Sequence, residues 1–133
     1  MSWKDLVDNG YVHPHESSRA EIGDLLALID RDLRDAAIEE LSDDRRFATS
    51  YNAALQLAKA AIAAAGYRPA KGNSAHFISF DAVKSAIPTD QVSELADFFD
   101  LCRRKRNNID YDASEVVTRT ETEEIIRRTK EFR

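Results

Sequence analysis

Apolar residues return every three or four positions along most of this chain, which is the spacing of one face of an α-helix. The first such segment carries Ile22, Leu25, Leu26, Ile29 and Leu33. It follows Ser18-Arg19-Ala20-Glu21, a sequence typical of a capping box, in which the Ser oxygen accepts a backbone N–H and the Glu side chain reaches back. The pattern predicts a helix from Ser18 to about Leu41.

A second helical segment follows directly. Ser42-Asp43-Asp44 offers a capping side chain and two acids for the positive end of a helix. Its apolar stripe consists of Phe47, Tyr51, Leu55, Ala58 and Ile62. Gly66 suits the residue after a helix end, and Pro69 prevents the helix from continuing. Residues 71–74 are then predicted to form a loop.

Residues 75–87 allow two interpretations. Phe77-Ile78-Ser79-Phe80 has the composition of a strand, but a single strand would have nothing to pair with. We therefore expect a short helix over 75–87, closed by Pro88. Thr89 then caps a fourth helix, whose apolar stripe consists of Val92, Leu95, Ala96, Phe99 and Cys102.

The two ends of the chain are less regular. A last helix is predicted from Ser114 to the C-terminus, but its apolar residues are poorly periodic, which favours packing at the periphery or against a partner. Residues 1–16 contain Asn9-Gly10 and Pro14, so we expect an irregular arm or one helical turn. The chain as a whole predicts an all-α fold, an antiparallel four- to five-helix up-down bundle in a single domain over 1–133.

Composition narrows the setting. The chain has 133 residues, one Cys and a net charge of −5. One Cys cannot build a disulfide framework, and we see neither a signal peptide nor an apolar run long enough for a membrane span, so we expect a cytoplasmic protein without membrane contact. A protein that coats nucleic acid unspecifically is normally basic, so any nucleic-acid contact must come from a local patch.

Such a patch lies at the end of the fourth helix, in Arg103-Arg104-Lys105-Arg106. Arg103 and Arg106 continue the apolar stripe beyond Cys102, so the dry face turns basic while the helix goes on. A guanidinium on such a face must be paired, face a cleft or lie beyond the core. A second interpretation is that the four cations only favour the negative end of the helix dipole.

The segment Arg106-Asn107-Asn108-Ile109-Asp110-Tyr111 resembles the R-x4-H signature of HEPN domains, which usually begins with Arg-Asn. The run from Tyr51 to Ile62 and the exit at residues 65–69 also resemble HEPN proteins, as does a His after the loop, here His76. The likeness spans roughly residues 18–130. It implies a homodimer that binds RNA and, if the chain is an enzyme, a metal-independent endoribonuclease without cofactor.

The chain departs from this signature at Tyr111, which occupies the position of the usual His. The resemblance makes Arg106, Asn107 and Tyr111 the candidate catalytic residues, and Arg103, Arg104, Lys105 and Arg106 the candidate nucleic-acid contacts. Tyrosine titrates near pH 10 and is a poor base at neutral pH, although it can donate a hydrogen bond to phosphate. We therefore expect weak or lost nuclease activity.

Other candidate residues carry less chemistry. His13 and His15 have a spacing that can bind metal, but no third ligand accompanies them, so a solvated arm is favoured and no metal site is predicted. His76 is interpreted as a helix-start or packing residue, with a catalytic role as the alternative. Tyr51 is expected in the core, with a place in a cleft as its second interpretation.

Two functions remain open from the sequence. One is an RNA- or nucleotide-binding component of a toxin–antitoxin or defence system, for which the resemblance implies a nucleotidyltransferase partner. The other is a non-catalytic helical module for dimerisation or interaction, whose basic segment only ends a helix.

Overall fold

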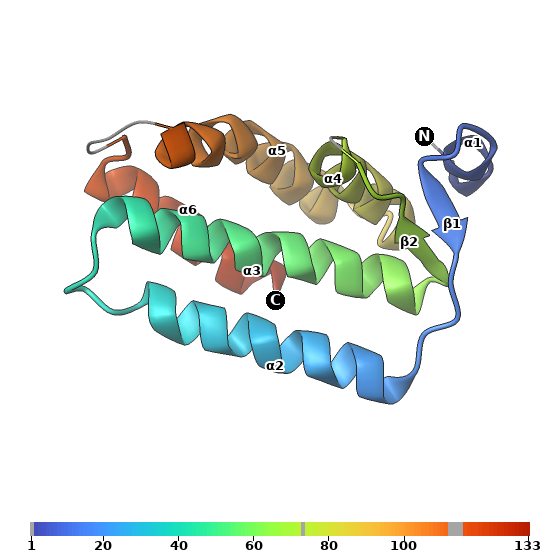
Figure 1. Cartoon of the computed structure of the whole chain (residues 1–133), viewed down its shortest axis with the longest axis horizontal. Helices are drawn as coiled ribbons and strands as arrows, with labels where there is room; N and C mark the ends of the chain where they lie inside the picture. Colours follow the sequence, from blue (N-terminus) through green and yellow to red (C-terminus); the bar gives the residue numbers. More distant parts are fainter. Residues whose placement is uncertain (1, 73, 112–115) are drawn as a thin grey trace.

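The computed structural model describes residues 2–72, 74–111 and 116–133, with the side chains of residues 110 and 111 outside that description. Within these residues the helices are α1 Trp3–Asp8, α2 Arg19–Ala36, α3 Asp43–Ala64, α4 Ala75–Ala86, α5 Asp90–Tyr111 and α6 Arg119–Phe132. Two short strands, β1 Val12–Pro14 and β2 Tyr67–Pro69, complete the described elements. The predicted all-α bundle is confirmed (Figure 1).

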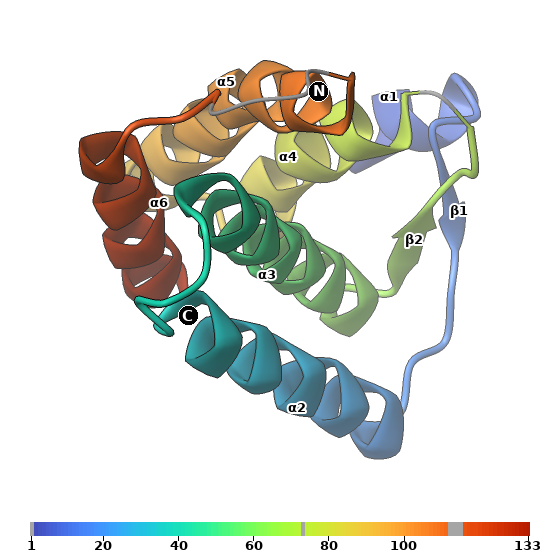
Figure 2. The ribbon, with the colours of Figure 1, turned by 60° about the vertical axis from the view of Figure 1, so that its left-hand side comes forward.

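Helix α3 is the centre of the bundle, with α2, α4, α5 and α6 packed around it (Figure 2). The predicted stripes of α3 and α5 are buried and meet in the largest core cluster, which includes Phe47, Tyr51, Leu55, Phe80, Leu95, Phe99 and Cys102. The Phe80 ring meets Tyr51 edge to face and stacks on Phe99, with both pairs of centroids 5.9 Å apart. Side chains of α3, α4 and α5 are therefore held together at one junction.

The helix starts largely follow the predicted caps. Ser42 accepts the backbone N–H of Arg45 at 3.2 Å, and Thr89 accepts that of Val92 at 3.2 Å. At α2 only half of the expected capping box forms, since Ser18 accepts the N–H of Glu21 while the Glu21 carboxylate lies 2.8 Å from Nε2 of His15. The expected return contact of Glu21 was therefore wrong.

Helix α2 is shorter than predicted. It ends at Ala36, and the carbonyl of Ala36 accepts a hydrogen bond from Nε of the buried Arg46 at 2.8 Å. Since this carbonyl bonds a side chain of α3, the chain turns toward α3 before reaching Leu41. Residues 75–86 form α4, so the choice of helix over strand is confirmed.

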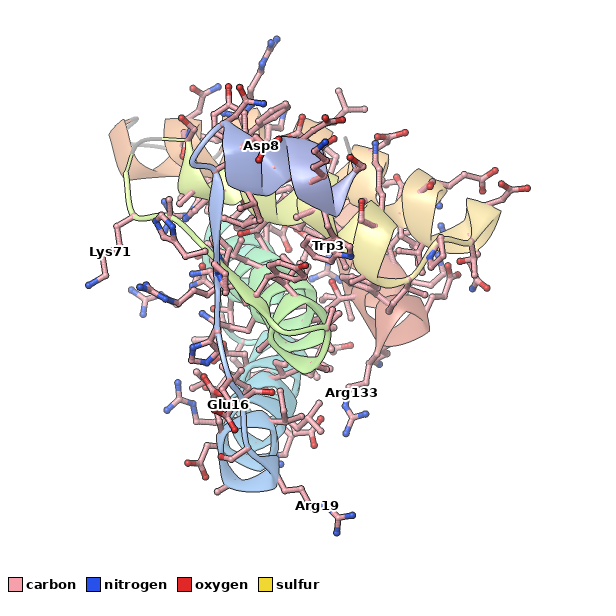
Figure 3. The ribbon with its side chains drawn as sticks, turned by 90° about the vertical axis from the view of Figure 1, so that its right-hand side faces the viewer. Trp3, Asp8, Glu16, Arg19, Lys71 and Arg133 are labelled. Atoms are coloured by element: carbon pink, nitrogen blue, oxygen red, sulfur yellow. The ribbon has the colours of Figure 1, made fainter. Side chains whose placement is uncertain are left out.

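The N-terminal segment, expected to be an irregular arm or one helical turn over residues 1–16, contains a short helix and a strand. It forms α1 and then β1, which pairs antiparallel with β2 so that His13 lies opposite Arg68. Trp3 of α1 stacks on Tyr67 of β2, with ring centroids 4.2 Å apart. Figure 3 views this end of the molecule, where α1 with Trp3 and Asp8 lies far from Glu16 and Arg19.

The last helix also corrects an expectation. Its predicted start at Ser114 lies outside the described residues, and described α6 begins at Arg119 after a complete capping box of Thr118 and Glu121. Peripheral packing was wrong, because Thr122, Ile125, Ile126 and Thr129 are buried and α6 packs along α3. Among the described helices, none is both long and apolar enough to cross a membrane.

Candidate functional site

The four cations of the basic segment lie on two sides of α5. Arg103 and Arg106 are half-buried, follow Phe99 and Cys102 along the helix, and continue its inner face. Arg104 is exposed and Lys105 is half-buried. The helical period thus divides the run Arg103–Arg106 instead of gathering all four cations in one patch.

Arg103 is held by two neighbours. Its Nε donates to the Asp100 carboxylate at 3.1 Å, one turn earlier on α5. Its guanidinium carbon lies 6.0 Å from the centroid of the Phe77 ring on α4, within the range of a cation–π contact. Arg103 therefore bridges α5 to the first turn of α4, where His76 precedes Phe77.

Tyr51 and His76 form a second pair at the same junction. Tyr51 of α3 is fully buried, and its hydroxyl oxygen lies 3.0 Å from Nδ1 of His76 on α4. Burial raises the pKa of the Tyr51 phenol above its ordinary value of 10.0, although Arg106 and Arg103 act in the opposite direction. The phenol therefore keeps its proton at neutral pH.

The imidazole of His76 lies in a positive field. Burial lowers its pKa from the ordinary value of 6.5, and the charges of Lys59, Arg106 and Arg103 lower it further. His76 is therefore neutral at pH 7. The structure thus brings Arg103, Arg106 and His76 into one electrostatic neighbourhood.

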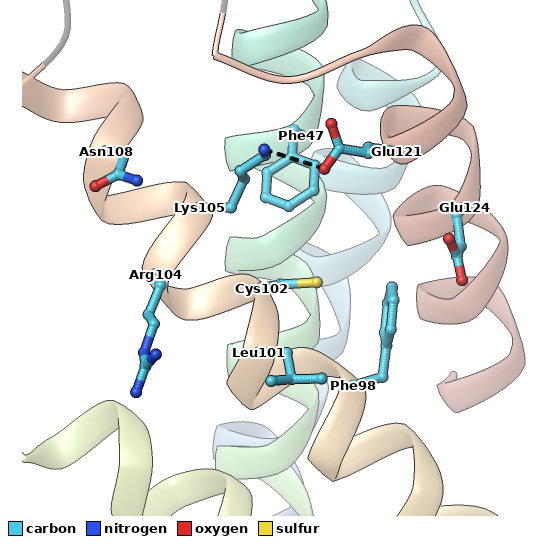
Figure 4. Close-up of a pocket in the computed structure, with 9 residues that line it drawn as sticks. All are labelled: Phe47, Phe98, Leu101, Cys102, Arg104, Lys105, Asn108, Glu121 and Glu124. Carbon is cyan, nitrogen blue, oxygen red and sulfur yellow. Dashed lines mark ion pairs between the residues drawn. The ribbon is translucent and has the colours of Figure 1, made fainter.

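On its other side α5 faces α6 across a cavity of about 340 Å³ (Figure 4). Its apolar wall consists of Phe47, Phe98, Leu101 and Cys102. Lys105 pairs with Glu121 across the cavity at 3.2 Å, whereas the Arg104 side chain extends away from α6. Lys105 is therefore already neutralised by α6.

The same cavity contains the one cysteine of the chain. Burial raises the pKa of the Cys102 thiol to about 12, and the carboxylates of Glu124 and Glu121 add to this effect. A thiol that stays protonated is a weak nucleophile. Cys102 thus acts as an apolar part of the wall.

A comparison with protein families identifies the chain. The family model described as SAV_6107-like HEPN matches residues 37–133, which is well over half of the chain. The chain belongs to this HEPN family. Neither a curated protein nor a solved structure was found to match it. The matched range contains α3 to α6, and hence all the helices that meet at Tyr51, His76 and Arg106.

The remaining residues of the HEPN-like signature lie at the end of α5. Asn107 and Asn108 are exposed, and Asn108 borders the cavity between α5 and α6. Tyr111 is the last residue of α5, and its side chain lies outside what the structure describes. The roles assigned to Arg106, Asn107 and Tyr111 therefore stay predictions.

The histidines of this HEPN chain have distinct surroundings. His13 is exposed on β1, and His15 contacts Glu21. Within the described ranges, no three His, Cys, Asp or Glu residues are arranged to hold a metal ion. His76 lies in the first turn of α4 and packs against Tyr51, which confirms its interpretation as a helix-start or packing residue, although its hydrogen bond with Tyr51, 25 positions away, was not predicted. The sequence did contain an indication of this contact: Tyr51 lies on an apolar stripe, and the hydroxyl of a buried Tyr needs a hydrogen-bond partner.

Proposed function

We propose that this HEPN protein binds RNA as a homodimer, in a toxin–antitoxin or defence system, and that Arg106 holds a phosphate of the RNA. The observation that carries the proposal is the half-buried position of Arg103 and Arg106 on the inner face of α5, beside His76. A helix that only ended in solvated cations would not turn two guanidinium groups toward its neighbours. Arginine suits this role because its planar fork matches phosphate oxygens.

The four cations of the basic segment are proposed to have different roles, because they lie on two sides of α5. Arg103 and Arg106 belong to the inner face and are proposed to contact the bound phosphate directly. Arg104, which is exposed, is proposed to add long-range attraction to the RNA backbone, and Lys105 would contribute to RNA binding only by leaving its ion pair with Glu121. Asn107 and Tyr111 follow on the same helix and are proposed to bind neighbouring polar groups of the RNA.

RNA cleavage is proposed to be slow or absent. Tyr111 stands where the family signature has His, and tyrosine as a residue type is a poor general base at neutral pH. The site keeps cations that stabilise a charged phosphate but lacks a base in that position. RNA binding with little turnover is the expected result.

The homodimer has its own support. Leu101 is 73% exposed on α5, two residues before the basic segment and beside the cavity between α5 and α6. Leu101 and the apolar wall of the cavity beside it form a contiguous apolar surface, and we propose that this surface is covered in the homodimer. The same surface supports the alternative function, an interaction module without RNA, in which Leu101 docks a partner protein.

Two measurements test the proposal. Fluorescence anisotropy with labelled single-stranded RNA should show binding that Arg106→Ala weakens and Arg127→Ala, a change of an exposed cation on α6, leaves intact. Growth arrest on expression in a bacterial host, relieved by Arg106→Ala, would support a toxin. A protein that binds no RNA and arrests no growth would leave only the interaction module. A nucleotidyltransferase encoded beside this chain would support the toxin–antitoxin setting.

A further inference from the structure

The hydrogen bond between Tyr51 and His76 has a defined direction. The Tyr51 hydroxyl is buried, and within the described part of the chain Nδ1 of His76 is the acceptor that the structure gives it. A buried hydroxyl hydrogen without an acceptor is costly, so we assign Tyr51 as the donor and Nδ1 of His76 as the acceptor. A neutral imidazole that accepts at one ring nitrogen carries its hydrogen on the other. Nε2 of His76 is therefore an N–H donor.

This tautomer excludes one role and favours another. Nδ1 accepts the hydrogen bond from Tyr51, and Nε2 carries its own hydrogen. Neither nitrogen is therefore available to remove a proton from a ribose hydroxyl. A neutral N–H donor can still bind an anion. His76 is half-buried, so its ring retains access to solvent and to a ligand.

The charges around His76 match such a ligand. Lys59 lies about two turns beyond Tyr51 on α3, and it acts on the His76 ring together with Arg103 and Arg106 of α5. Asp100 neutralises part of the charge of Arg103, which its carboxylate contacts. Lys59, Arg103 and Arg106 are each half-buried, and their positive charges act on the His76 ring from α3 and α5.

We propose that Nε2–H of His76, together with Lys59, Arg103 and Arg106, forms a binding site for one phosphate group of RNA, and that Tyr51 positions the imidazole. The site lies within a single protomer. The proposal rests on the RNA-binding function above and deepens it, because it assigns residues of α3 and α4 to the phosphate. Its chemistry also fits inorganic phosphate, so the experiment includes both ligands.

The first test measures the tautomer. In ¹⁵N-labelled protein, the ring nitrogens of His76 should show a protonated Nε2 and an unprotonated Nδ1 at neutral pH. Tyr51→Phe removes the donated proton and should shift this signature toward a mixture of tautomers. A protonated Nδ1 in the wild-type protein would overturn the proposal.

The second test measures binding to labelled single-stranded RNA by anisotropy. His76→Ala should weaken binding roughly tenfold or more, as expected for a hydrogen bond to a charged group. His76→Gln places an amide N–H near Nε2 and should recover most of the affinity. His13→Ala, a change of an exposed histidine on β1, is the matched control and should bind as wild type. Thermal unfolding of each variant verifies that it folds.

Titration with inorganic phosphate distinguishes an error in the site proposed here from an error in the proposed RNA-binding function. If RNA binds and His76→Ala binds it equally well, the site assigned here is wrong while the RNA-binding function stands. If RNA does not bind but phosphate shifts the ring signals of His76, the anion site stands and RNA is excluded as its ligand. If neither ligand perturbs His76, both proposals are overturned.

Discussion

The hydroxyl of Tyr51 lies 3.0 Å from Nδ1 of His76, so a buried residue of α3 fixes the ring of a histidine in the first turn of α4. The rings of the two residues are tilted, with centroids 5.8 Å apart. The contact links the aromatic core, through Phe80 and Phe99, to the cations of α5. Packing of the core and orientation of the proposed site are therefore coupled.

Tyr51→Phe should lower the free energy of unfolding by about 1 kcal/mol, since the substitution removes one buried hydrogen bond and keeps the ring. Urea denaturation measures the change. Tyr67→Phe is the control, because the Tyr67 ring stacks on Trp3 while its hydroxyl makes no hydrogen bond within the described residues. Equal stability of Tyr51→Phe and wild type would argue against the hydrogen bond.

The low pKa of His76 predicts a pH dependence of stability. Burial is its largest cause, followed by the charges of Lys59, Arg106 and Arg103. The unfolded chain binds a proton at His76 near pH 6.5, whereas the folded chain does so only at lower pH. The free energy of unfolding should therefore fall as pH falls from 6.5 toward the folded pKa, and should be unaffected by this group above 6.5.

His76→Gln tests this dependence, since glutamine does not titrate. The difference in unfolding free energy between wild type and His76→Gln should change across that window and level off above it. Urea denaturation over a pH series gives the difference. A difference that stays constant with pH would mean that the folded and unfolded chains titrate His76 alike.

Arg46→Ala should destabilise the protein by roughly 1–3 kcal/mol, because the Ala36 carbonyl at the end of α2 would lose its charged donor. The control is Arg45→Ala, which changes an exposed cation one residue earlier. Thermal and urea unfolding measure both variants. Similar stability of the two variants would show that the buried guanidinium does not hold the α2–α3 turn.

Leu101→Gln should weaken the proposed homodimer, because it replaces an apolar side chain that would be covered in the assembly. Size-exclusion chromatography with light scattering measures the mass over a concentration series. Ile38→Gln, a change of another exposed apolar residue, lies outside α5 and should leave the mass unchanged. A monomeric wild-type protein would contradict the two-protomer arrangement.

The sequence predicted those features that depend on local spacing. Ser42 and Thr89 capped their helices as expected, and the stripe from Val92 to Cys102 is buried. The same helical period explains why Arg103 and Arg106 lie on the inner side of α5. These features need only the periodicity of one helix and the chemistry of its first turn.

Other features depend on contacts between distant segments. Strand β1 pairs with β2 so that His13 lies opposite Arg68, and no local sequence pattern specifies this pairing. The packing of α6 in the core was not predicted because Thr122 and Thr129 are polar residues. Together with Ile125 and Ile126, however, they form the buried face of this helix. Both hydroxyls bond carbonyls one turn earlier, at 3.0 Å and 2.7 Å, which makes their burial possible.

The central claim is that Arg106 binds a phosphate of RNA, and an anisotropy titration at several salt concentrations tests it most directly. Wild-type protein should bind labelled single-stranded RNA, and Arg106→Ala should bind it at least about tenfold more weakly. The slope of log K against log salt should decrease in magnitude by about 0.7 in this variant, since one phosphate contact is lost. Arg127→Ala should retain wild-type affinity. Equal affinity and equal slope for Arg106→Ala and wild type would contradict the account.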